Sequence, residues 1–131
     1  MSENSEQYFF NFSFFKVDPK WRWMADLAKE ESAKEVENII NNSKIMFRSY
    51  SNLGLRDDAD FLFWFAAPTV EEIQTVIEKL YKTVFGKYII ASMTYLSCTR
   101  PSLYVKDQKT LGFITGDNPK KHVIVYPFTK T

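Results

Sequence analysis

The sequence predicts an α+β fold of the ferredoxin-like kind, with elements in the order β-α-β-β-α-β and an antiparallel four-stranded sheet that carries two helices on one face. Two observations predict it. Four short segments have the apolar pattern and the aromatic or β-branched content of strands. After the first and after the third of them, a capping residue introduces a stretch with apolar residues at helical spacing.

The first strand and the first helix fill the first third of the chain. Residues 8–17 are an almost unbroken aromatic run, which is typical of a short strand buried on both faces. Asp18 and Pro19 follow, a carboxylate suited to cap a helix and a proline suited to its first position. Apolar residues then recur at helical spacing, so we predict a helix over 19–41, and a break near Ser32 is compatible with the spacing.

The second and third strands are predicted to be neighbours joined by a loop. Residues 44–51 alternate as a strand does, and residues 60–66 form a second aromatic strand. The segment 52–54 ends in Gly54 and favours a turn between them.

The second helix has the clearest signals in the chain. Thr69 and Glu72 have the spacing of a capping box, and Gly86 marks the expected end. We therefore predict a helix over 70–85, followed by a fourth strand over 88–97.

The predicted sheet has a second face that the two helices leave uncovered. The first and third strands are apolar on successive residues, so neither has a polar face for solvent. An apolar surface of this size marks an interface. We therefore predict that this face packs against another sheet, from a second copy or from the chain's own tail, as part of a dimeric α/β-barrel architecture.

Composition excludes several classes of protein. A formal net charge of +1 argues against a nucleic-acid surface, and no apolar run approaches the length of about 20 residues that crosses a membrane. The polar, acidic start predicts no signal peptide. The single cysteine, Cys98, excludes an internal disulfide and fits a reducing compartment. The prediction is a cytoplasmic protein that binds neither nucleic acid nor membrane.

Four regions are predicted along the chain. Residues 1–7 are a flexible N-terminus, and residues 8–105 form the ferredoxin-like domain. Residues 106–121, with two glycines and a proline, form a loop or linker. Residues 122–131 begin with a β-branched run, and we expect them to be the first strand of a second ferredoxin-like domain that is not present in this chain.

Three segments resemble the chlorite dismutase-like superfamily, which includes the chlorite dismutases and the coproheme decarboxylases. Residues 48–64 (RSYSNLGLRDDADFLFW) resemble its hairpin, and residues 91–104 (ASMTYLSCTRPSLY) resemble its fourth strand and the exit from it. Residues 126–130 (YPFTK) resemble the segment that opens its second domain. The resemblance implies two ferredoxin-like halves, a homo-oligomer that is usually a pentamer, and haem or coproporphyrin iron held by the second half.

The resemblance also implies roles for two residues, as catalytic and as cofactor-binding groups. In the coproheme decarboxylases the tyrosine of the YPFTK segment is a radical relay, and its lysine acts on a propionate. These roles would fall on Tyr126 and Lys130. The family's proximal histidine belongs to the second half, and His122, just ahead of the segment, does not match it. We therefore predict no metal ligand and no active haem binding for this chain alone.

Each candidate has a plainer interpretation. Tyr126 and Lys130 have the character of a tyrosine at a strand end and a solvated lysine. A lone His122 is more often an exposed residue before a strand than an iron ligand. Cys98 is more often a small buried residue than a nucleophile.

Other polar groups point to no cofactor either. Asp57, Asp58 and Asp60 lack the glycine spacing of a calcium loop, which favours a polar turn. A set of basic residues might bind propionates but is more often solvated: Arg56, Arg100, Lys120 and Lys121. Trp21, Trp23 and the phenylalanine clusters are expected in the core or at a subunit interface and not around a cofactor.

Two functional classes remain. In the first, the chain is the N-terminal half of a haem-dependent oxidoreductase whose intact form decarboxylates coproheme or acts on chlorite. We favour decarboxylation because haem synthesis is widespread. In the second, it is a haem-less structural or oligomerisation module that pairs sheet to sheet. The sequence does not decide whether the chain is a natural half, an expressed part or a proteolytic product.

Overall fold

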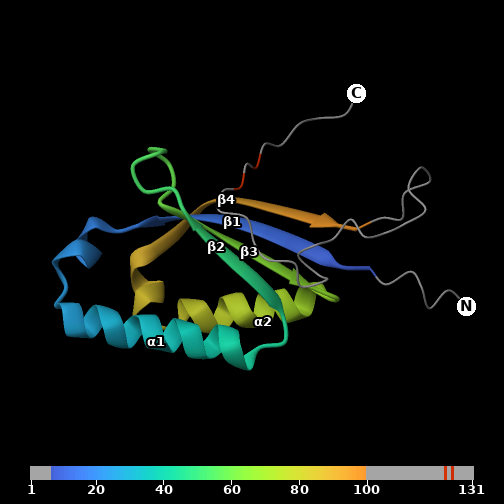
Figure 1. Ribbon diagram of the computed structural model, residues 1–131, viewed down its shortest axis with the longest axis horizontal. Helices are drawn as coiled ribbons and strands as arrows, with labels where there is room; N and C mark the ends of the chain where they lie inside the picture. Colours follow the sequence, from blue (N-terminus) through green and yellow to red (C-terminus); the bar gives the residue numbers. More distant parts are fainter. Residues whose placement is uncertain (1–6, 100–122, 124, 126–131) are drawn as a thin grey trace, which may run out of the picture.

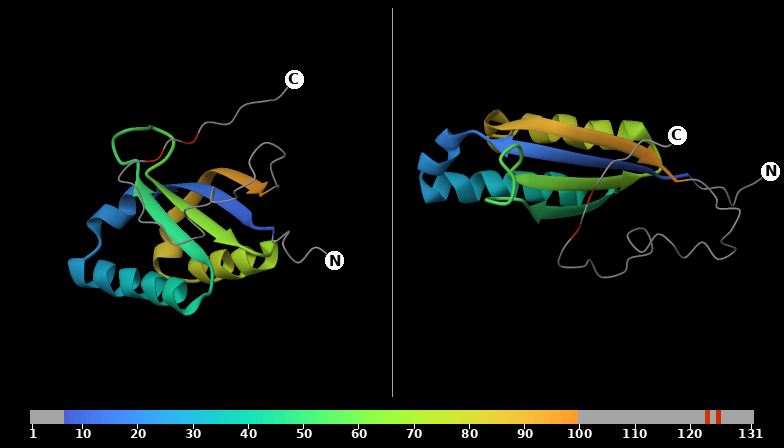
Figure 2. Two further views of the ribbon diagram at one scale, coloured as in Figure 1. Left: turned by 45° about the vertical axis from the view of Figure 1, so that its right-hand side comes forward. Right: turned by 90° about the horizontal axis from the view of Figure 1, so that it is seen from above.

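A computed structural model describes residues 7–99 together with Val123 and Val125. It shows one antiparallel four-stranded sheet with two α-helices along one side, in the strand order β2-β3-β1-β4 (Figures 1 and 2). This confirms the predicted ferredoxin-like fold. The strands are β1 (Phe9–Val17), β2 (Met46–Ser51), β3 (Phe61–Ala67) and β4 (Ile89–Cys98); the helices are α1 (Asp26–Asn42) and α2 (Val70–Tyr81), with the 3₁₀ helices η1 (Pro19–Trp23) and η2 (Phe85–Tyr88).

Strand β1 is central because it pairs with both β3 and β4. Phe12 lies opposite Trp64 on one side and Tyr95 on the other. Paired residues in an antiparallel ladder share a face, so the register divides the sheet in two. The helix-covered face carries residues such as Phe15, Phe63 and Phe65. The open face carries Phe10, Phe12, Phe14, Arg48, Tyr50, Leu62, Trp64, Met93 and Tyr95.

The main core lies between the sheet and α2. Phe15 and Phe65 on the sheet pack in one cluster with Ile73, Val76 and Leu80 of α2. The three α2 residues recur at helical spacing, so a single stripe of the helix is buried. Helix α1 buries only Ser32 fully among its residues. The fold therefore depends on α2 for most of its helix–sheet packing.

The predicted first helix is in fact two elements. Asp18 does cap a helix, and its carboxylate accepts a hydrogen bond from Lys20 N at 2.9 Å, but that helix is the short η1. Met24 and Ala25 are extended, and α1 begins only at Asp26. No break occurs at Ser32. Its buried hydroxyl instead accepts a hydrogen bond from Phe85 N at 2.8 Å, which joins α1 to η2.

The second helix begins as predicted and ends earlier. Thr69 accepts from Glu72 N at 3.2 Å, and its hydroxyl donates to the Glu72 carboxylate at 2.8 Å. Helix α2 ends at Tyr81 rather than at residue 85, and Gly86 lies inside η2. A Cβ on Gly86 would lie 2.6 Å from Tyr81 O, so glycine is needed there for a close approach and not as a helix cap.

The remaining predicted regions lie largely outside the described residues. These are the N-terminus 1–7 apart from Gln7, the linker 106–121, and the strand 122–131 apart from Val123 and Val125. Within the part of the chain that the structure describes, neither helix has the length and apolarity needed to cross a membrane.

Candidate functional site

The residues predicted to carry chemistry lie outside the described residues. This holds for Tyr126, Lys130 and His122, and also for the basic residues at 100, 120 and 121. The structure does describe Val125, which precedes Tyr126, and Val123. Both valines are half-buried, and they contact the open face of the sheet. The open face is therefore the part of the described structure that Val123 and Val125 contact.

Aromatic rings cover one half of the open face. Phe12 stacks on Trp64, with ring centroids 5.1 Å apart and an interplanar angle of 28°. Phe10 meets the same indole edge-on at 6.2 Å. The Arg48 guanidinium lies 5.6 Å from the Trp64 ring centroid, within the range of a cation–π contact. All four side chains are half-buried, so this half presents a continuous aromatic surface with one cation.

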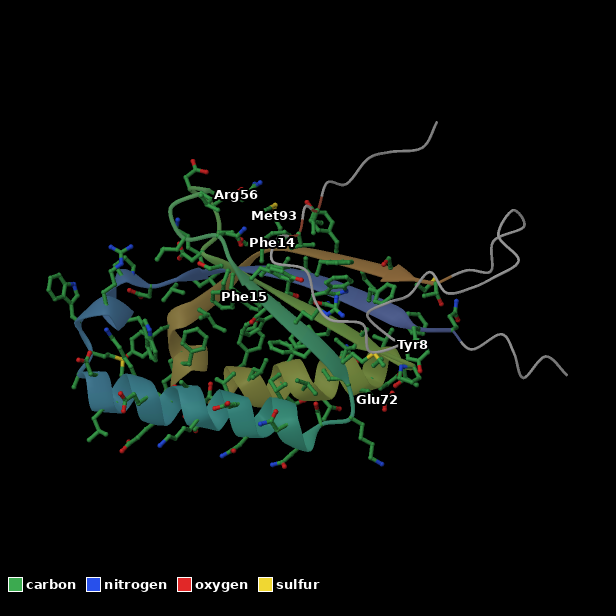
Figure 3. All side chains as sticks on the ribbon, in the orientation of Figure 1. Tyr8, Phe14, Phe15, Arg56, Glu72 and Met93 are labelled. Atoms are coloured by element: carbon green, nitrogen blue, oxygen red, sulfur yellow. The ribbon has the colours of Figure 1, made fainter. Side chains whose placement is uncertain are left out.

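The other half of the open face is a smaller core, which we call the Phe14 cluster. It consists of the buried residues Phe14, Ala59 and Leu62, and Figure 3 shows Phe14 and Met93 on the side of the sheet away from the helices. Several half-buried side chains surround it: Phe12, Tyr50, Met93, Tyr95, Val123 and Val125. Two of these side chains, Val123 and Val125, come from outside the sheet and its hairpin loop.

The loop before β3 borders the Phe14 cluster and contributes Ala59 to it. Arg56 holds Asp58 through two contacts of 2.7 Å, one from Nε and one from an Nη. This hydrogen bond lowers the pKa of Asp58 and raises the pKa of Arg56. The nearby Asp57 and Tyr95 raise the pKa of Arg56 further. Lys16 Nζ donates to the carbonyl of Asp57.

Asp60 fixes the base of the same loop. Its carboxylate accepts a hydrogen bond from Val17 N at 2.7 Å, and its backbone carbonyl accepts one from Asn52 N at 2.7 Å. Gly54, with φ +80°, provides the turn predicted at 52–54. Two of the three acidic residues therefore have structural partners, Asp58 in Arg56 and Asp60 in the end of β1, as expected for a polar turn. Among the described residues, no three His, Cys, Asp or Glu side chains gather as metal ligands would.

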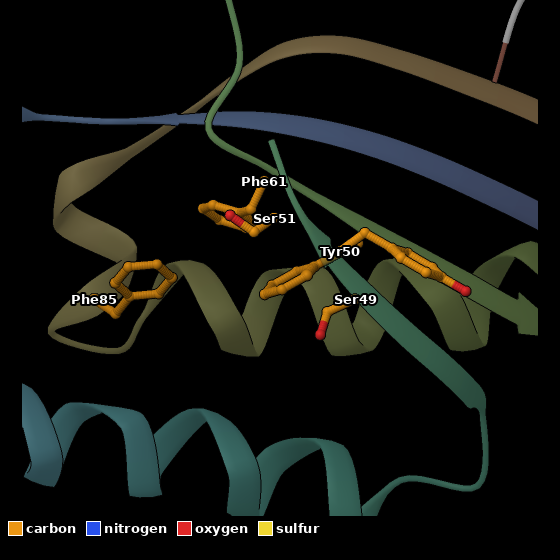
Figure 4. Close-up of a pocket in the computed structure, with 6 residues that line it drawn as sticks. Ser49, Tyr50, Ser51, Phe61 and Phe85 are labelled. Carbon is orange, nitrogen blue, oxygen red and sulfur yellow. The ribbon is translucent and has the colours of Figure 1, made fainter. Parts of the chain in front are cut away.

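A shallow cavity opens beside β2 and η2. Its volume is about 230 Å³, and it is lined by Ser49, Tyr50, Ser51, Phe61, Phe63 and Phe85 (Figure 4). Ligand sites for drug-sized molecules usually have about 300–1,000 Å³. This cavity is therefore too small for a porphyrin.

Two features escaped the sequence reasoning. Cys98 was expected to be buried and is exposed, because it lies on the edge strand β4. The docking of Val123 and Val125 on the Phe14 cluster was not foreseen as a specific contact. Its signal is the two-residue spacing of the valines, which places both side chains on one side of an extended segment.

Comparison with known proteins places these observations in a family. The chlorite dismutase family model matches residues 29–131. A coproheme decarboxylase from Mycolicibacterium smegmatis is 28% identical over 131 residues, which are 98% of this chain and 56% of that protein.

Solved structures show the same fold. Chlorite dismutase from Candidatus Nitrospira defluvii in complex with imidazole superposes with a TM-score of 0.71 at 23% identity, over 74% of this chain and 42% of that one. A point variant of that protein gives 0.70 at 20% identity, over 88% and 50%. The chain therefore spans about half the length of the relatives it matches.

Proposed function

Because the chain belongs to the chlorite dismutase family, we propose that it forms the first half of a haem-dependent oxidoreductase that decarboxylates coproporphyrin iron. One observation carries the choice of reaction. A relative that aligns over nearly the whole chain is a coproheme decarboxylase, whereas the solved chlorite dismutases, at under 25% identity, support the fold alone. Chlorite chemistry is the alternative within the same class.

The described residues do not fit a porphyrin. The cavity beside β2 is too small, and the only histidine of the sequence, His122, is outside the described residues. We therefore propose that the second half of the intact protein holds the iron, which supplies the redox chemistry when bound. The intact protein is proposed to be a cytoplasmic homo-oligomer.

Two residues of this chain are proposed to act in the reaction. Tyr126 has a phenol that can give up an electron and a proton together, and Lys130 has an ammonium that can pair with a propionate carboxylate. The support is the match of residues 126–130 to the family's YPFTK segment, which the family model also spans.

The test uses the complete reading frame that contains these residues. Binding of coproporphyrin iron is followed by titration at the Soret band. Peroxide is then added, and the mass of the porphyrin product is measured by mass spectrometry. The Tyr126→Phe variant should bind the porphyrin but lose decarboxylation. The Lys130→Ala variant should bind the porphyrin more weakly. Tyr88→Phe, which removes a tyrosine hydroxyl in η2, is the control. Full decarboxylation by Tyr126→Phe would refute the assignment. Oxygen release from chlorite with the porphyrin mass unchanged would select the alternative reaction.

The same assay on the 131-residue chain tests where the iron is held. We expect no Soret shift and no turnover. Turnover that survives His122→Ala would show that an unidentified ligand lies within these residues.

A second candidate function is a haem-less structural or oligomerisation module. The observation that favours it is the open face, whose aromatic half is only half-buried in the described chain. A complete protein that assembles in solution, measured by mass, yet gives no Soret shift would support the module and exclude the oxidoreductase.

A further inference from the structure

The cavity beside β2 exists because two serines stand among phenylalanines on the helix-covered face. Ser49 and Ser51 of β2 lie on this face, directly opposite Phe63 and Phe61 of β3. Phe47, two residues before Ser49, packs edge-on against Phe63 with ring centroids 4.9 Å apart. A serine side chain is too short to make such a contact, so the packing stays incomplete at this edge of the sheet. The sequence of β2 thus builds the cavity.

Three phenylalanine rings form the apolar wall of the cavity (Figure 4). The ring centroid of Phe61 lies 4.6 Å from that of Phe63 and 5.7 Å from that of Phe85. Phe63 belongs to the main core, and the half-buried Phe61 and Phe85 pack against this core. The wall is therefore supported from behind by the core.

The volume of the cavity favours a ligand with one ring. At about 230 Å³ the cavity is larger than an engineered apolar cavity of roughly 150 Å³ that binds benzene. It is smaller than the roughly 300 Å³ at which sites for drug-sized molecules begin. A single six-membered ring with one small substituent therefore fits this space.

The lining of the cavity favours a neutral ligand. It consists of serine, tyrosine and phenylalanine, without a cation among the described residues that form it. A carboxylate would lose hydration there without gaining a partner of opposite charge. The Ser51 hydroxyl accepts a hydrogen bond from Leu53 N at 3.2 Å, whereas no other described residue bonds the Ser49 hydroxyl. Ser49 can therefore donate to, or accept from, a hydroxyl group of a ligand.

We propose that this cavity binds a neutral phenol or single-ring aromatic alcohol, with the ring against Phe61, Phe63 and Phe85 and the hydroxyl on Ser49. Aromatic pairs gain energy from edge-on and offset-stacked contacts beyond the area that they bury, which favours an aromatic ring over an aliphatic ring of the same size. The ligand is small and the cavity is open, so we expect roughly millimolar affinity. The inference goes beyond the proposed function, since it requires neither porphyrin nor iron.

Three matched ligands test the chemistry of the site by fluorine NMR of the 131-residue chain. The chemical shift of 4-fluorophenol should change and saturate as protein is added. Fluorobenzene, which lacks the hydroxyl, should bind about 2–10-fold more weakly because one hydrogen bond is lost. The anion 4-fluorobenzoate should not bind. Benzoate binding as tight as that of the phenol, or no saturable shift with the phenol, would refute the proposal.

Substitutions of Ser49 locate the ligand. Ser49→Leu should fill the cavity and abolish binding of 4-fluorophenol. Ser97→Leu, the same change on the exposed edge strand β4, is the control and should keep the affinity of the unmodified chain. Thermal unfolding checks that both variants are folded.

Ser49→Ala keeps the cavity open and decides the question even if Ser49→Leu does not fold. It should weaken binding of 4-fluorophenol by about 2–10-fold and leave binding of fluorobenzene unchanged, because only the hydrogen bond to the ligand hydroxyl is removed. Equal affinity of Ser49→Ala and the unmodified chain for 4-fluorophenol would overturn the assignment of Ser49.

Discussion

Both faces of the sheet carry apolar residues, but they are covered to different extents. Phe65 and Trp64 are neighbours in β3 and point to opposite faces. Phe65 is 0% exposed in the core beneath the helices, whereas Trp64 is half-buried against Phe12 and Arg48. An apolar strand therefore shows that both faces are suited to burial, but not that the same chain buries both.

The ring contacts of the two faces differ in the same way. On the helix-covered face, Phe63 meets Phe61 at 4.6 Å and Phe47 at 4.9 Å between centroids, and this group packs in one cluster with residues of both helices. On the open face, Trp64 packs against side chains of adjacent strands. We infer that the first face supplies most of the folding stability.

The largest expected effect on stability comes from truncating two neighbouring side chains of β3, one on each face of the sheet. Phe65→Ala should lower the free energy of unfolding by about 3–5 kcal/mol, because it leaves a cavity in a closed core. Trp64→Ala should cost less than half of that in the same chain, because its surroundings are partly solvent. Urea denaturation of both variants measures the difference. Equal losses would mean that the open face is already closed in solution.

A smaller effect is expected from added volume. Gly86→Ala should destabilise the chain by about 1–3 kcal/mol, because the new methyl group would meet Tyr81 O at 2.6 Å and Leu80 O closer still, and backbone atoms cannot rotate away. The control is Ser97→Val on the exposed edge strand β4, which should be nearly neutral. Thermal unfolding compares the two. A neutral Gly86→Ala would show that the junction of α2 and η2 is looser than the structure indicates.

The sequence was a good guide where local chemistry decides the structure. The Thr69–Glu72 capping box and the strand β1 follow from residue type and spacing, and both are present. It was a poorer guide where tertiary contacts decide. Helix α2 ends at Tyr81 although the apolar spacing continues, and Gly86 approaches the last turn of α2 too closely for a Cβ atom.

The same limit applies to the candidate site. Residue types and the family resemblance gave Tyr126 and Lys130, which remain predictions because they lie outside the described residues. No local pattern shows which surface Val125 will contact, since its partners Phe14 and Leu62 are far away in sequence. Long-range packing of this kind becomes visible only in three dimensions.

The smallest expected effect concerns the loop at the rim of the open face. Asp58 has a pKa below its ordinary value of 3.8 because Arg56 donates a hydrogen bond to its carboxylate. A carboxyl group whose pKa is lower in the folded state stabilises the fold above its unfolded pKa, and this contribution is lost as the pH falls through the folded value. Both side chains are about half exposed, so solvent screening should keep the stability change small. Carbon-detected NMR of the Asp58 carboxyl group should give a midpoint below 3.8, and Arg56→Gln should raise it toward that value. An unchanged midpoint in Arg56→Gln would show that the ion pair does not hold in solution, and that the rim of the open face is less ordered than the helix-covered core.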